Sequence, residues 1–278
     1  MSNAKSRRIR LRQWAVLEPY ASAQRYISGI SSRSPIVDRA SESQIRLEGE
    51  IFSRMGYIHE PRNLTSAHDF FVINRIVPLP NSLIVQLDPS SDTSKLNFSL
   101  LPTWERGSDA MENGVRGLRH IVDHRQGAVH FHVPGEHARV TFQGIDTRAF
   151  INAREEWIRS GFGQTVDSDS GLTPEEMNTG WGDRKAGPVA SAFIRRSGLL
   201  QLLEPKWIDC WSSLHRFSVE VSIRDDAFDN VEMIIDQITS RAFSPRLERL
   251  PVQPTSSYYH PLLLEGTDLE LDLRITTL

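Results

Sequence analysis

Cysteine is almost absent from this chain, which contains only Cys210 among its 278 residues. One thiol cannot form an intramolecular disulfide, and nothing in the chain points to an oxidising compartment. No apolar run approaches the roughly 18 to 20 residues of a transmembrane helix, and charges stand where a signal peptide has its apolar stretch. The sequence therefore predicts a soluble, cytoplasmic protein without a membrane partner.

Lysine is also scarce. Only four of the 32 basic residues are lysines, so the other 28 are arginines. Arginine binds planar anions through two parallel hydrogen bonds and stacks on bases, which suits contact with phosphate or nucleic acid. A GC-rich coding sequence produces the same bias, so composition leaves both explanations open.

Familiar catalytic motifs and internal repeats are missing as well. The chain has no Walker-type glycine loop, no GxGxxG, GxSxG or HExxH string and no CxxC pair. These absences disfavour several enzyme superfamilies and exclude solenoids and propellers. Whether the protein is an enzyme stays open. Its content of 39% hydrophobic and 24% charged residues is typical of a globular chain with one large core or two ordinary ones.

Positive charge is concentrated at the start of the chain. The first acidic residue is Glu18, and the five basic residues before it are Lys5, Arg7, Arg8, Arg10 and Arg12. A block of +5 in a chain of net charge −3 is typical of a segment that contacts a polyanion. We predict that residues 1–17 form a detached basic arm whose five basic side chains bind nucleic acid.

Hydrophobic periodicity predicts alternating helical and extended segments. Helices are expected over 38–55, 109–124, 147–160 and 228–242, hairpins over 69–88 and 128–143, and further strands over 96–101, 217–223 and 269–275. This pattern predicts an α+β fold with antiparallel or mixed sheets and helices packed on one face, for which two α/β sandwich (ferredoxin-like) halves are one arrangement. The polar stretch 161–171 predicts a linker between an α+β region at 18–163 and another at 172–278.

Five of the nine histidines lie within eighteen residues: His120, His124, His130, His132 and His137. The first two are expected on the exposed side of the 109–124 helix, as surface residues. If Pro134-Gly135 forms a two-residue turn, His132 pairs with His137 and His130 pairs with Arg139, all on one sheet face. We predict that these four residues are catalytic, with imidazoles as acid and base and Arg139 stabilising an anion.

A longer loop would separate His137 from His132, because a proline-glycine pair is not the favoured two-residue hairpin turn. The histidine face would then be a polar surface exposed to solvent or covered in an interface.

The string from His130 through His132 and Glu136 to Gly144 resembles the first metal-binding motif of the cupins over about fifteen residues. The resemblance implies a divalent transition metal bound by His130, His132 and Glu136. The interval from Glu136 to Gly144 is a residue longer than in that motif, and no second motif follows. Cupins are also all-β, whereas several helices are predicted here.

Three functions therefore remain open. The first is a nucleic-acid-associated protein whose basic arm binds phosphate and whose histidine-arginine face processes RNA or DNA. The second is a non-catalytic subunit that binds other protein subunits in a larger assembly, and the third is a histidine-ligated metalloenzyme.

Overall fold

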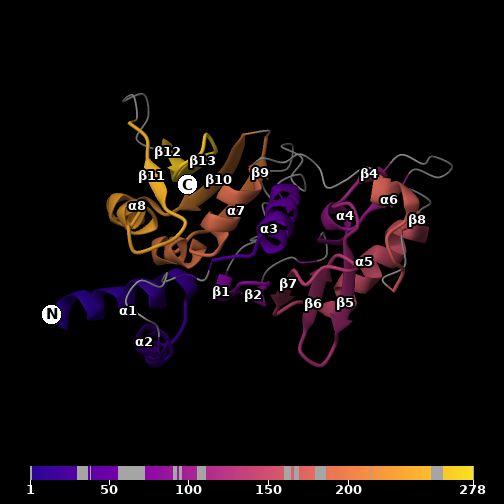
Figure 1. Ribbon diagram of the computed structural model, residues 1–278, viewed down its shortest axis with the longest axis horizontal. Helices are drawn as coiled ribbons and strands as arrows, with labels where there is room; N and C mark the ends of the chain where they lie inside the picture. Colours follow the sequence, from indigo (N-terminus) through magenta and orange to yellow (C-terminus); the bar gives the residue numbers. More distant parts are fainter. Residues whose placement is uncertain are drawn as a thin grey trace.

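The computed structural model describes residues 2–29, 37, 39–55, 73–89, 93, 96–104, 111–159, 164–165, 169–178, 186–213, 215–251 and 259–277. The chain adopts a mixed α+β fold with two mixed five-stranded sheets (Figure 1). This confirms the predicted fold class. Within the described residues, no helix has the length and apolarity needed to cross a membrane.

The first sheet has the strand order β1-β2-β7-β6-β5. Its strands are β1 (Ile73–Leu79), β2 (Ser82–Leu87), β5 (Arg119–Asp123), β6 (Ala128–His132) and β7 (Arg139–Gln143). Strands β2 and β7 run parallel, and the other neighbours are antiparallel. Both predicted hairpins, β1–β2 and β6–β7, are confirmed.

The register of the β6–β7 hairpin differs from the predicted one. His132 pairs with Arg139 rather than with His137, because residues 133–138 form a longer connection than a two-residue turn. A shift of two residues keeps every side chain on its original face. His130 and His132 therefore still share a face with Arg139, whereas His137 leaves the sheet.

The helix predicted over 109–124 is wrong. The segment contains the short strand β4 (Met111–Asn113), two turns and β5. Gly114 and Gly117 have φ angles of +90° and +72°. Glycine adopts such positive angles readily, but an α-helix requires φ near −60°, so the helix cannot pass through these residues. These turns interrupt the apolar positions whose spacing imitates a helix.

The strand predicted over 96–101 is also wrong, because this segment forms helix α4 (Leu96–Leu100). Leu96 and Leu100 lie one helical turn apart and both are buried. Strand β4 instead joins a small antiparallel sheet with β3 (Thr103–Trp104) and β8 (Gln164–Thr165). Strand β8 lies inside the polar stretch that was predicted to be a linker.

The second large sheet has the order β11-β12-β13-β10-β9. Its strands are β9 (Trp207–Ser212), β10 (Arg216–Ile223), β11 (Leu247–Arg249), β12 (Tyr259–Leu264) and β13 (Glu270–Thr277). Strands β10 and β13 are parallel neighbours, and η4 (Asp225–Asn230) and α8 (Val231–Ile238) lie between them in the sequence. The predicted strand-helix-strand unit is therefore present.

Helix α3 (Glu42–Met55) connects the two sheets. It packs against α7 (Gly187–Ile194) and also contacts β7 and β9. The close crossing depends on two glycines, since a Cβ atom added to Gly49 would lie 2.2 Å from the Cα atom of Gly187. Helix α3 thereby packs together segments from both halves of the sequence.

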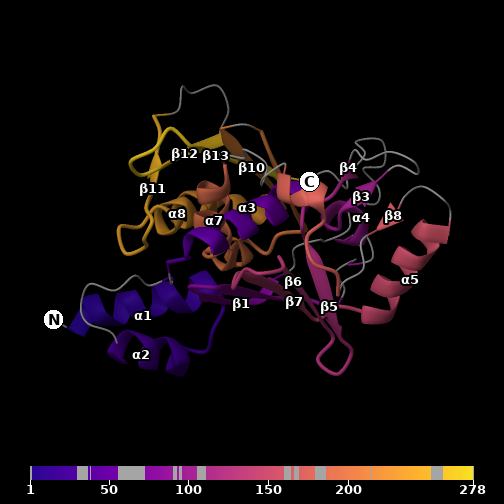
Figure 2. The same ribbon diagram turned by 45° about the vertical axis from the view of Figure 1, so that its right-hand side comes forward.

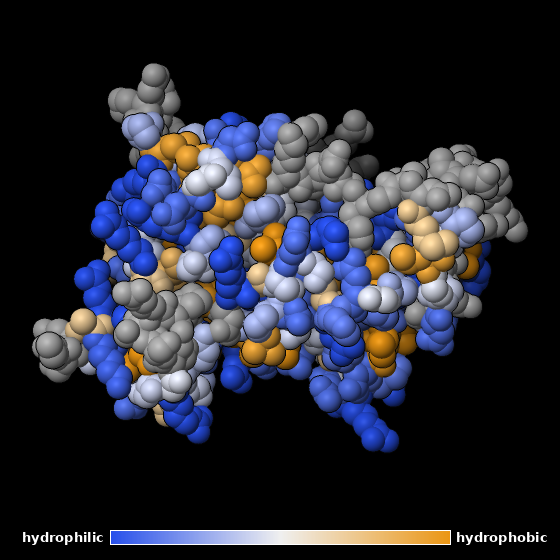
Figure 3. All heavy atoms as spheres, in the orientation of Figure 1, coloured by the Kyte–Doolittle hydropathy of each residue, from blue (hydrophilic) through white to orange (hydrophobic). Residues whose placement is uncertain are grey.

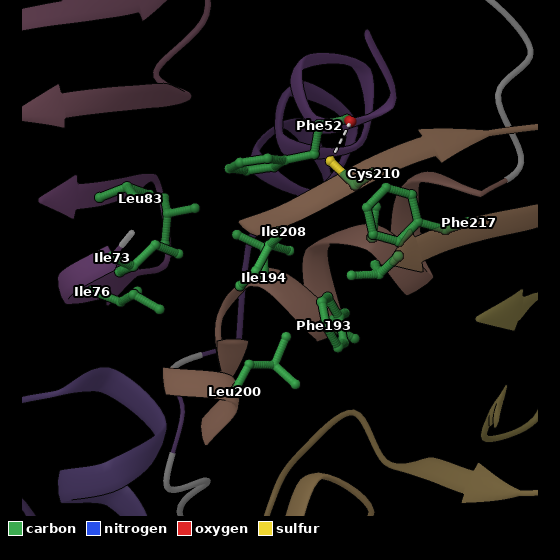
Figure 4. Packing of buried hydrophobic residues seen from close by; sticks show 14 of the residues in the cluster. Phe52, Ile73, Ile76, Leu83, Phe193, Ile194, Leu200, Ile208, Cys210 and Phe217 are labelled. Carbon is green, nitrogen blue, oxygen red and sulfur yellow. Dashed lines mark hydrogen bonds between the residues drawn. The ribbon is translucent and has the colours of Figure 1, made fainter. Parts of the chain in front are cut away.

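Buried hydrophobic residues from regions 18–163 and 172–278 belong to one continuous cluster. Figure 4 shows Phe52 of α3 beside Cys210 of β9, whose Sγ lies 3.2 Å from the Phe52 carbonyl oxygen. Phe193 of α7 and Ile73 of β1 belong to the same cluster. The domain boundary stays a prediction, but the two regions share a core.

The start of the chain is a packed helix rather than a detached arm. Helix α1 (Ser2–Val16) packs against α2 (Tyr20–Gly29) and the 3-10 helix η3 (Ser197–Leu203), beside β1 (Figures 1 and 2). Its buried apolar residues are Ile9, Leu11, Ala15 and Val16. This packing fixes the helix on the body of the protein.

The remaining helices are α5 (Thr147–Arg159) and α6 (Pro174–Asn178). Asp146 caps α5, since its carboxylate accepts hydrogen bonds from the backbone N–H groups of Arg148 and Ala149, both at 3.0 Å.

Candidate nucleic-acid interface

The outer side of α1 carries cationic and aromatic side chains together. Arg7, Arg10 and Trp14 occur at helical spacing, within a sector of about 60° around the helix axis. Both arginines are exposed, and 36% of Trp14 is exposed. Within the described residues neither arginine forms an ion pair. We call Arg7, Arg10 and Trp14 the α1 face.

The other basic residues of the predicted arm lie differently. Lys5 is exposed but projects from another side of the helix, and Arg8 is half-buried. Arg12 is 4% exposed, its Nε atom donates to Glu18 at 2.7 Å, and its guanidinium lies 3.3 Å from the centre of the Tyr26 ring. Arg12 therefore stabilises the α1–α2 corner, and its inclusion among the nucleic-acid-binding residues is corrected.

Helix α2 adds two exposed groups close to this corner of the molecule. Tyr20, at the start of α2, is 42% exposed, and Arg25 is exposed while donating to the hydroxyl of Ser22 at 3.4 Å. In Figure 3 hydrophilic residues lie at this corner, at the lower left, beside a few apolar ones. Helices α1 and α2 thus expose arginines together with the rings of Trp14 and Tyr20.

The histidine-arginine face consists of His130, His132, Arg139 and Thr141 on β6 and β7. The Nδ1 atom of His130 lies 2.9 Å from the hydroxyl oxygen of Thr141, its cross-strand partner. Arg139, the partner of His132, is exposed, and within the described residues the Nδ1 atom of His132 has no hydrogen-bond partner. The predicted face is therefore present without His137.

Both imidazoles of this face have lowered pKa values. Burial lowers the pKa of His130 and the charge of Arg139 lowers it further, while Asp123 acts in the opposite direction. For His132, burial acts together with the charges of Arg139 and Arg119. Neutral imidazoles can accept a proton, and Arg139 can contact an anion, but an acid-base pair needs one imidazole to be protonated.

The predicted metal site is not supported. Within the described residues, which include His130, His132 and Glu136, no group of three or more histidine, cysteine, aspartate or glutamate side chains could hold a metal ion. Glu136 instead accepts a hydrogen bond from Nη2 of Arg46 at 2.9 Å. The open mixed sheets also differ from the all-β fold that the cupin resemblance implies.

The three other clustered histidines lie apart from this face. His137 is exposed in the 133–138 connection. His120, predicted at the surface, is 6% exposed and packs edge-on against Phe150, with ring centres 5.7 Å apart. His124 is exposed, and its Nδ1 atom lies 2.9 Å from the hydroxyl oxygen of Thr147.

Sequence reasoning missed a group of arginines that the fold brings to one pocket, Arg39, Arg195 and Arg196. The sequence signal for this group is the adjacent pair Arg195-Arg196, which directly follows an apolar helix. Each of these two charges needs a partner or solvent, so the pair indicates a polar site at the end of that helix.

No protein family, curated protein or solved structure matches the chain.

Proposed function

We propose that this protein binds nucleic acid, with the α1 face as its contact surface. The observation that carries the proposal is the alignment of Arg7, Arg10 and Trp14 on the solvent side of a helix whose other side is packed. Exposed arginines attract phosphates, and the aromatic ring of Trp14, one helical turn beyond Arg10, offers a stacking surface for an unpaired base. This combination favours a single-stranded partner.

The packing of α1 supports the proposal, because the helix needs no folding on binding. Its buried residues include Ile9 and Leu11, which lie on either side of the exposed Arg10 in the sequence. A surface that is already ordered avoids the entropic cost that a disordered basic arm has when it binds.

Fluorescence anisotropy with a short labelled single-stranded RNA or DNA tests this function. The double variant Arg7→Ala/Arg10→Ala is expected to bind at least about tenfold more weakly than the wild type, and Trp14→Leu about tenfold more weakly, as loss of one stacked base requires. The matched control is Arg148→Ala/Arg241→Ala, which removes the same charge from exposed positions elsewhere. Equal losses in both double variants would show a nonspecific charge effect and contradict the proposal.

Point substitutions are preferable to deletion of residues 1–12. The deletion would also remove the buried Ile9 and Leu11 and the ion pair of Arg12 with Glu18. Loss of binding in such a chain would report on folding as much as on contact.

Strand cleavage at the histidine-arginine face stays a prediction. The bound RNA or DNA, analysed by gel after incubation, tests it directly. Cleavage by these residues requires that His132→Asn slows the reaction while His137→Asn, in the neighbouring exposed loop, leaves the rate unchanged.

A further inference from the structure

An arginine-lined pocket of about 200 Å³ lies between α7, residues 244–245 and the connection from β12 to β13. Its wall includes Arg39, Arg195 and Arg196 together with apolar side chains such as Ile45 and Leu264. None of the three residues of the α1 face contributes to it. We call it the Arg196 pocket.

Arg196 is the unusual member of this wall. It is fully buried, and its Nη1 and Nη2 atoms donate to the carbonyl oxygens of Ile238, at 3.2 Å, and Pro245, at 2.6 Å. Its guanidinium also lies 4.8 Å from the centre of the Phe243 ring. Within the described residues, its Nε atom has no hydrogen-bond partner and its guanidinium forms no ion pair.

Among the described residues, therefore, no carboxylate balances the positive charge of Arg196. Burial lowers the pKa of its guanidinium to about 9, so the group is still protonated at neutral pH. Ile238 is the last residue of α8, and the partial negative charge at that helix end offsets part of the cost. A buried charge without a counter-ion nevertheless costs several kcal/mol.

The charge of the neighbouring Arg195, by contrast, is balanced by a carboxylate. Its side chain is also buried, and its Nη2 atom lies 2.7 Å from Oε1 of the buried Glu48. The same guanidinium donates to the carbonyl oxygen of Leu79. Arg195 is thus paired with a buried carboxylate, whereas Arg196 lies in the wall of a pocket.

The remaining charges of the wall strengthen the imbalance. Arg39 is exposed and, within the described part of the chain, forms no ion pair. Among the described residues of the wall the one carboxylate is Glu265, which is exposed and forms no ion pair with Arg39 or Arg196. With Arg195 neutralised by Glu48, this described part of the wall has an excess of positive charge.

We propose that the Arg196 pocket binds a small organic anion. A carboxylate or phosphate group contacts the exposed Arg39 and is attracted by the charge of Arg196, which lies buried in the wall behind it, and a compact apolar body lies against Ile45, Ala192 and Leu264. An apolar cavity of about 150 Å³ holds one benzene molecule, so this volume suits an anion with a ring-sized body. The proposal is independent of nucleic-acid binding at the α1 face.

Isothermal titration calorimetry of the full chain tests the pocket with four probes: benzoate, phenyl phosphate, inorganic phosphate and the uncharged benzyl alcohol. Benzoate or phenyl phosphate is expected to bind at one site, at least about tenfold more tightly than the other two probes. The tighter of the two identifies the preferred head group. Inorganic phosphate binding as tightly as phenyl phosphate would contradict the apolar part of the site.

Arg39→Ala is expected to weaken this binding about tenfold, and Arg39→Lys to restore part of it, whereas Arg148→Ala on α5 leaves it unchanged. Because Arg196→Met also removes two hydrogen bonds and can prevent folding, Arg196 is better followed in the intact protein. The Nε–H signal of Arg196 in an arginine-labelled NMR spectrum should shift when the bound probe saturates the site. The proposal is overturned if neither benzoate nor phenyl phosphate binds at about 10 mM. It is also overturned if a probe binds but neither shifts the Arg196 signal nor loses affinity in Arg39→Ala.

Discussion

Arg119 of β5 and Glu176 of α6 form a fully buried ion pair, with Nη2 2.7 Å from Oε2 and Nη1 3.0 Å from Oε1. Glu176 is held in place by a capping box, in which its backbone N–H donates to the hydroxyl of Thr173 and its carboxylate accepts from the Thr173 N–H. The pair therefore anchors the polar segment 169–178 to the edge strand of the first sheet.

Glu176→Gln is expected to lower the free energy of unfolding by about 3 to 5 kcal/mol, because it leaves the Arg119 charge buried without its counter-ion. Urea denaturation measures the loss. The double variant Arg119→Met/Glu176→Leu should recover much of it, since both charges are then removed. Glu155→Gln, which breaks an exposed pair with Arg159, serves as the control and should change stability by less than about 0.5 kcal/mol.

His120 is expected to make the protein less stable in acid. Burial, together with the charges of Arg154 and His132, lowers its pKa from 6.5 to about 4. Below pH 6.5 the unfolded chain binds a proton that the folded chain does not, so this contribution is complete above pH 6.5 and is lost as the pH falls toward 4. The loss amounts to at most about 3 kcal/mol.

Denaturation of His120→Leu at a series of pH values checks this expectation. Its stability should fall less steeply with acid than that of the wild type between pH 6.5 and 4, while the exposed-loop control His137→Asn keeps the wild-type slope. Identical slopes for all three proteins would show that His120 is not the group responsible.

Gly49→Ala is expected to destabilise the protein by roughly 3 kcal/mol or more, although alanine favours a helix over glycine. The added methyl group would lie 2.2 Å from the Cα atom of Gly187 and would force α3 away from α7. Gly29→Ala is the matched control, since no atom lies within 4 Å of the position of its added Cβ. Thermal unfolding of both variants distinguishes close helix crossing from simple helix propensity.

Hydrophobic periodicity predicted the strands and helices whose formation depends on residues close together in the sequence. The strands expected over 217–223 and 269–275 form as β10 and β13, although Ser218, Ser222 and Asp272 on their polar face are also buried. The helix expected over 147–160 forms as α5. The predicted face with His130, His132 and Arg139 also forms, because an error of two residues in register does not change the side of a sheet.

Long-range packing decided the features that sequence reasoning missed. Apolar spacing around Gly114 and Gly117 imitated a helix, but their positive φ angles produce turns between strands. The burial of Arg12, the pairing of Arg119 with Glu176 and the burial of Arg196 each depend on segments that meet only in the folded chain. No local pattern distinguishes such arginines from exposed ones.

The salt dependence of nucleic-acid binding tests the central claim most directly. Anisotropy titrations of one single-stranded oligonucleotide at several salt concentrations give the slope of log K against log salt for the wild type and for Arg7→Ala/Arg10→Ala. If both arginines contact phosphates, the slope of the variant is shallower by about 1.4, and the Arg148→Ala/Arg241→Ala control keeps the wild-type slope. Equal slopes for all three proteins, or no binding by the wild type at low salt, would contradict nucleic-acid binding at the α1 face.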